Sequence, residues 1–112
     1  MSQTDRRIDT PVLLNEIGMT IPTGVVQNLD NYDSMSFQAT LSNMAATSVD
    51  FKIYESNDGE VFTEMVDFRD TKDEDGSAVW DFDAITSRFL QFIATPNGGS
   101  VDFKLTFYGK RH

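Results

Sequence analysis

Hydrophobic and polar positions alternate along much of the chain, most clearly in residues 48–68. Val49, Phe51 and Ile53 are separated by single residues, which is the period of a strand with one buried face. Residues 57–59, Asn-Asp-Gly, are a turn signal, and the segment EVFTEMVDF that follows is typical of a returning strand. The pattern therefore predicts a β-hairpin.

The register of this hairpin follows from which cross-strand pairs are chemically matched. A loop of residues 57–59 pairs Ile53 with Thr63, whereas a loop of residues 58 and 59 alone pairs Ile53 with Glu64. The second arrangement sets a charge opposite an apolar residue on the face meant for the core. We therefore predict the three-residue loop, a type I turn whose glycine is left-handed. The predicted pairs are Phe51–Met65, Lys52–Glu64 and Ile53–Thr63.

The same alternation marks further strands. Residues 35–41 and 78–82 alternate cleanly, and a short strand runs from Val25 toward Leu29. Residues 12–21 leave two possibilities open, a pair of strands broken near Asn15 or a helical turn.

A second hairpin is predicted around residues 96–99, Pro-Asn-Gly-Gly, because its pairing is chemically consistent. The predicted pairs are Leu90–Leu105, Phe92–Phe103 and Ala94–Val101. Seven or eight short strands without a convincing helix indicate an all-β protein, an antiparallel β-sandwich of jelly-roll type. The predicted core consists of Phe37, Phe51, Ile53, Trp80, Phe92, Phe103 and Leu105.

The length of 112 residues fits one domain. We expect a flexible N-terminal arm at residues 1–11, the sandwich at 12–109 and a basic tail at 110–112. The initial Met1 is consistent with a complete small gene product. No segment has the apolar core of a signal peptide or the length of a membrane span, so no membrane partner is expected.

The net charge of -9 disfavours nucleic acid as a partner, since a nucleic-acid groove needs clustered Lys and Arg. The chain has no cysteine, so thiolate chemistry is not expected. His112, at the last position, is its only histidine, which makes a Ser-His-Asp triad improbable. We expect no enzyme, no catalytic residue and no cofactor.

Residues 68–76, FRDTKDEDG, form the strongest candidate for a metal site. They resemble a calcium loop, but Thr71 occupies the first ligand position and Phe82 stands where the last glutamate belongs. Two interpretations stay open: a solvated acidic loop, which we favour, or a hard cation held by Asp70, Asp73 and Asp75. The expectation is therefore no metal.

Two groups of residues are candidates for binding a partner. Tyr54 and Phe62 are neighbours in the predicted hairpin, on the face opposite Phe51, and form either a contact surface or a covered part of the fold. Arg6, Arg7 and Ile8 lie in an arm that cannot join the core, and the two arginines carry positive charge on an acidic chain.

Residues 48–109 resemble the second half of a discoidin-type, galactose-binding-like jelly roll. The resemblance rests on Ser56-Asn57-Asp58-Gly59 followed by Phe62, on the segment Arg88 to Phe92, and on the closing Phe107-Tyr108-Gly109. It implies a sandwich that binds a carbohydrate or a cell surface. The chain departs from that family in being shorter, in lacking flanking cysteines and in having no match to the ligand loops.

The whole chain also resembles the small β-sandwich proteins of tailed-phage virions, such as capsid decoration or auxiliary proteins. Those are short, acidic and free of cysteine, with a polar N-terminal arm. They also share the segment in which a Ser-x-Asp-Gly turn connects two strands. This resemblance implies a structural protein located in the virion, with other virion proteins, including further copies of itself, as partners. The alternative is a carbohydrate- or surface-binding module outside the cell, whose partner is a glycan.

Overall fold

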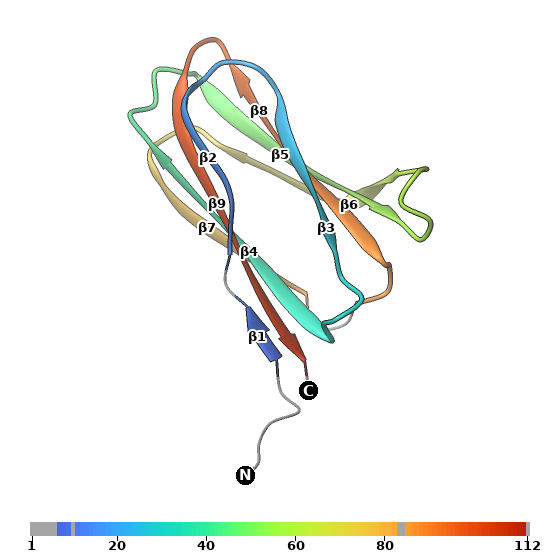
Figure 1. Cartoon of the computed structure of the whole chain (residues 1–112). Coiled ribbons are helices and arrows are strands. Elements are labelled where there is room, and N and C mark those ends of the chain that lie inside the picture. Colours follow the sequence, from blue (N-terminus) through green and yellow to red (C-terminus); the bar gives the residue numbers. More distant parts are fainter. Residues whose placement is uncertain (1–6, 10, 83–84, 112) are drawn as a thin grey trace.

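The computed structural model describes residues 7–9, 11–82 and 85–111, the side chains from residue 11 onward, and shows an all-β protein (Figure 1). No helix among these residues is long and apolar enough to cross a membrane. The described strands are β1 (Arg7–Asp9), β2 (Val12–Met19), β3 (Thr23–Asn28), β4 (Ser34–Ser42), β5 (Ser48–Ser56), β6 (Thr63–Lys72), β7 (Gly76–Phe82), β8 (Phe89–Asn97) and β9 (Val101–Arg111).

The strands form two antiparallel sheets packed face to face, which confirms the predicted sandwich. One sheet has the order β2-β9-β4-β7, with β1 beside the far end of β9, and the other has the order β3-β8-β5-β6. The pairs β2–β9, β3–β8, β4–β7 and β5–β6 are nested about the middle of the chain. This is one long antiparallel hairpin rolled up so that β9 meets β4 and β8 meets β5, which is the jelly-roll topology.

The core forms from the alternating residues that face between the sheets. Of the seven predicted core residues, all except Trp80 are at most 1% exposed. Trp80 is half-buried and packs on Phe51, with 5.0 Å between the ring centroids. The alternation thus identified the inward face of each central strand correctly.

The predicted register of the β5–β6 hairpin is wrong. Tyr54 pairs with Glu64, and Lys52 pairs with Arg69. Between these two pairs the chain covers two residue steps in β5 but five in β6. The extra residues make a bulge in β6, and the loop extends from residue 57 to 62 rather than 59. Matching apolar faces across an unbroken ladder could not reveal this insertion, although the left-handed Gly59 is confirmed at φ 77°.

The predicted β8–β9 hairpin is also wrong, because these strands belong to different sheets. β8 pairs with β3 and β5, whereas β9 pairs with β1, β2 and β4. Phe92 and Phe103 therefore meet across the core as stacked rings, 6.5 Å apart, and not as neighbours in one ladder. The Gly-Gly turn carries the chain from one sheet to the other.

Strand pairing extends into the segments that were expected to be the N-terminal arm and the basic tail. Residues 7–9 of the arm pair as β1 with β9, and β9 continues through Lys110 and Arg111 of the tail. Residues 12–21 contain one strand, β2, with two irregularities. Most of the predicted acidic loop at 68–76 is strand, since β6 ends at Lys72 and only residues 73–75 connect it to β7.

Candidate functional site

Tyr54 and Phe62, the two aromatic residues that were expected to be cross-strand neighbours, are not paired in the β5–β6 ladder. Tyr54 lies on the outer face of the sheet that contains β5, with Gln91 and Glu64 as its neighbours in the adjacent strands. Phe62 is half-buried in the loop before β6 and has no position in the ladder. Their predicted cross-strand contact was a consequence of the wrong register.

The Ser-Asn-Asp-Gly motif forms the framework of the β5–β6 loop. The Asp58 carboxylate accepts the backbone N–H groups of Glu60 and Val61, at 2.9 and 3.0 Å, and the hydroxyl of Ser56 at 2.9 Å. These three donors lower the pKa of Asp58 to about 2, with Val61 the largest cause. The motif therefore has a clear structural role in this chain.

Arg88 ties the start of β8 to the loop after β3. Its guanidinium donates to both carboxylate oxygens of Asp30, at 3.1 and 2.9 Å, and lies over the ring of Phe89 at 5.4 Å. The paired hydrogen bonds lower the pKa of Asp30 and raise that of Arg88. In the segment from Arg88 to Phe92, which resembles the discoidin family, the arginine thus binds another residue of the same chain.

The acidic residues around the β6–β7 turn do not converge. Asp70 accepts the indole N–H of Trp80 at 3.0 Å, whereas Asp75 accepts the backbone N–H of Met44 at 3.0 Å. Within residues 11–82 and 85–111, no group of three His, Asp or Glu residues is arranged to hold a metal ion.

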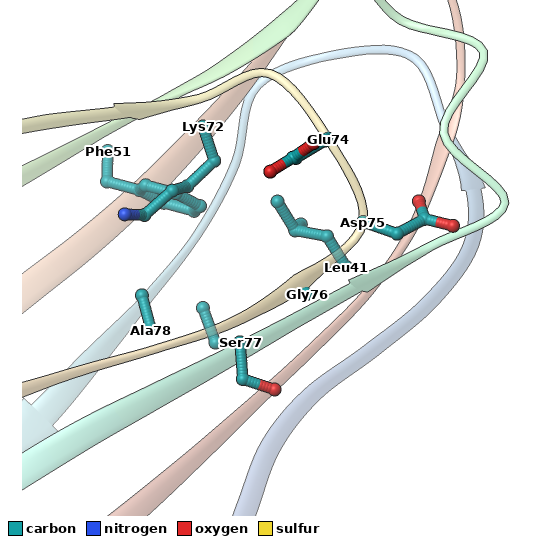
Figure 2. Close-up of a pocket in the computed structure, with 9 residues that line it drawn as sticks. Leu41, Phe51, Lys72, Glu74, Asp75, Gly76, Ser77 and Ala78 are labelled. Atoms are coloured by element: carbon teal, nitrogen blue, oxygen red, sulfur yellow. The ribbon is translucent and has the colours of Figure 1, made fainter.

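A hollow of about 150 Å³ opens between the sheets beside this turn (Figure 2). Ala39 and Ala78 are opposite each other in β4 and β7, and their small side chains leave this space above Phe51. Figure 2 shows Lys72 beside the Phe51 ring and the Asp75 carboxylate directed away. The hollow has an apolar floor and a charged rim. Its lining contains Ser77 but no histidine that could activate this hydroxyl as a nucleophile.

A second, shallow hollow of about 400 Å³ lies on the outer face of the five-stranded sheet. It is lined by Ser36, Gln38, Val79, Thr106, Phe107 and Tyr108. Val79 and Tyr108 are 54% and 38% exposed there. An aromatic and an aliphatic side chain among small polar ones make a surface that suits a protein contact. Sequence analysis missed Tyr108, although it alternates with the core residues of β9.

Residues near the two termini come together at one end of the sandwich, where β1 pairs with the last residues of β9 (Figure 1). In this pairing Arg7 is opposite Arg111 and Ile8 is opposite Lys110, while Arg6 lies outside the described residues. We call the rungs formed by Arg7, Ile8, Lys110 and Arg111 the terminal rungs. Like charges directly opposite each other destabilise a strand pair, so a partner that supplies carboxylates would stabilise this end.

Together, the topology and these surfaces define a jelly-roll sandwich with exposed sheet faces and paired termini. No family model and no curated protein matches the sequence. Among solved structures, the crystal structure of SPBc2 prophage-derived protein YomS is similar, with a TM-score of 0.62 and 16% sequence identity. The match covers 97% of this chain and 99% of that one, so the two share the fold over their whole length.

Proposed function

We propose that this chain is a non-enzymatic structural protein of a tailed-phage virion, a capsid decoration or auxiliary protein. The whole-length similarity in fold to a prophage-derived protein supports the phage origin. The resemblance of the sequence to small, acidic, cysteine-free virion sandwiches supports the structural role. Other virion proteins, including further copies of the chain, are the partners under this proposal.

The terminal rungs are the observation that carries the proposal. Positive charge from both ends of the sequence is collected on one short strand pair, although the chain as a whole has a net charge of -9. β1 is also an edge strand, so its outer side is available for backbone hydrogen bonds. A partner that offers a strand edge and carboxylates would bind both features at once.

Docking through this end would make the arm part of the contact. Arg6, Arg7 and Ile8 are then the contact residues of the arm. Tyr54, on the outer face of its sheet, and Phe62, in the loop before β6, remain proposed contacts elsewhere on the surface.

The test removes the arm and follows assembly into particles. Deleting residues 1–10 should reduce incorporation of the chain into the virion, and Arg6→Ala with Arg7→Ala should do so while preserving the β1 backbone. Lys52→Ala is the matched control, because it removes an exposed cation from the outer face of the other sheet. Each variant is first compared with the unaltered chain by thermal unfolding.

Unchanged incorporation of both arm variants would contradict docking through the terminal rungs. Selective glycan binding by a stable monomer, independent of the arm, would instead favour a carbohydrate-binding module.

A further inference from the structure

The sandwich has four outer sheet edges within its described residues, and they differ in regularity. β1 and β2 form one edge, β7 the other edge of that sheet, and β3 and β6 the edges of the second sheet. The registers of β2 and β6 are interrupted by shifts, which hinder the addition of another strand. β3 and β7 pair without any shift, so their edges are regular templates.

The β7 edge is also where core aromatics remain partly accessible. Trp80 and Phe82 are half-buried, and both pack against Phe68 of β6, with ring centroids 5.6 and 6.3 Å apart. Val79, which precedes Trp80 and faces outward, is 54% exposed and borders the shallow hollow. A strand added beside β7 would cover apolar surface on both faces of the sheet.

Charge distinguishes the β7 edge from the β3 edge. Residues 60–82, which contain β6 and β7, include eight acidic residues and two basic ones. Residues 20–29 around β3 contain no charged residue. Two β7 edges would repel each other, whereas a cationic strand would gain from the same field.

We propose that the β7 edge is a docking site for an extended basic segment of a partner protein, which adds as a strand to the five-stranded sheet. Backbone hydrogen bonds along β7 supply the affinity, and side chains on one face of the segment cover Trp80. Lys or Arg on the other face reach Asp81, which is exposed on β7. The site lies on the edge opposite the terminal rungs and does not depend on the virion assignment.

Trp80 provides a direct readout, because it is the only tryptophan in the chain. The probe is a synthetic peptide in which lysine and threonine alternate, titrated into the intact protein. We expect a saturable shift of the Trp80 emission that weakens with added salt. The counterpart in which glutamate replaces lysine should produce no shift.

Two matched pairs of variants locate the site. Val79→Lys should weaken peptide binding about tenfold or more, because an edge lysine opposes a cationic strand. Val26→Lys, on the exposed face of the β3 edge strand, should leave it unchanged. Asp81→Asn should also weaken binding, without altering the apolar surface, whereas Glu16→Gln on the distant β2 edge should not.

The proposal is overturned if the glutamate peptide binds as well as the lysine peptide, or if Val79→Lys and Asp81→Asn both retain the affinity of the unaltered protein. It is equally overturned if Val26→Lys abolishes binding, since the occupied edge would then be β3. Should Val79→Lys fail to fold, Asp81→Asn alone decides between these results.

Discussion

Asp58 shows how a single carboxylate can determine the length of a loop. Its side chain accepts the backbone N–H groups of Glu60 and Val61. In a tight turn, backbone carbonyl groups would accept such hydrogen bonds instead. Ser56 supports it from the end of β5 by donating its hydroxyl to Asp58 and accepting the N–H of Gly59. The loop consequently runs to residue 62, and β6 begins later than a three-residue turn would allow.

The first prediction concerns the pH dependence that follows from Asp58. Folding lowers its pKa from 3.8 to about 2, so its carboxylate stabilises the protein fully above pH 3.8 and loses this contribution as the pH falls toward 2. Asp58→Asn should reduce the acid-side slope of unfolding free energy against pH in this window. Chemical denaturation at a series of pH values measures the slope.

Asp67→Asn, which removes a charge from an exposed position on β6, controls for the change in net charge. Equal slopes for Asp58→Asn and the unaltered protein would show that the three hydrogen bonds do not persist in solution.

The residues that the sequence identified for partner binding illustrate what alternation can reveal about a surface. It correctly placed Tyr54 away from the core, because a residue beside Ile53 in a strand must face outward. It could not place Phe62, whose position depends on the hydrogen bonds of Asp58. The role of Arg88 was equally hidden, since its partner Asp30 is 58 residues away in sequence.

At the scale of the elements, alternation predicts a strand and its buried face but not its neighbours. β8 and β9 both have apolar residues at alternate positions. This pattern fits two strands paired in one sheet as well as two strands that face each other from different sheets. What decides between them is the turn: Gly99 allows the chain to pass close to Ala45 and so cross between sheets. The backbone N–H groups of Ala45 and Ala46 both donate to the backbone carbonyl oxygen of Ser100, and these hydrogen bonds stabilise the crossing.

The second prediction tests this crossing with two glycines of similar φ. At Gly99, φ is 155° and an added Cβ would lie 2.6 Å from the Ala45 carbonyl oxygen. Gly99→Ala should therefore destabilise the protein by about 2 kcal/mol, from overpacking added to backbone strain. Gly76 has φ 146° and open space around its Cβ position, so Gly76→Ala should cost clearly less.

Urea unfolding of the two variants gives the comparison. Equal losses of stability would mean that backbone strain alone matters and that the approach to Ala45 is absent.

At the scale of the whole molecule, the sequence was sufficient for the sandwich because the central strands each bury one face, which produces local alternation. It was insufficient for the candidate surfaces, which arise from pairing between distant segments. The shallow hollow joins Gln38 of β4 to Val79 of β7 and Thr106 of β9. The terminal rungs likewise exist because β9 lies between β1 and β4, which brings residues 7–9 beside residues 109–111.

The two proposed partner contacts, at the terminal rungs and at the β7 edge, lie at different places on the molecule. Its principal extents are 50 × 33 × 20 Å, and the terminal rungs and the acidic β6–β7 turn lie at opposite ends of the sandwich. If both proposals hold, the chain would have two separate contacts, as a subunit within a larger assembly requires.

The most direct test of the proposed structural role is to ask where the chain resides after infection by a phage that encodes it. Virions are purified through a density gradient, and the chain is quantified by mass spectrometry in the particle fraction and in the unassembled protein fraction. A structural protein of the virion is expected to sediment with the particles in a fixed ratio to the major virion proteins. A chain found entirely as free protein, and absent from the particles, would contradict the account.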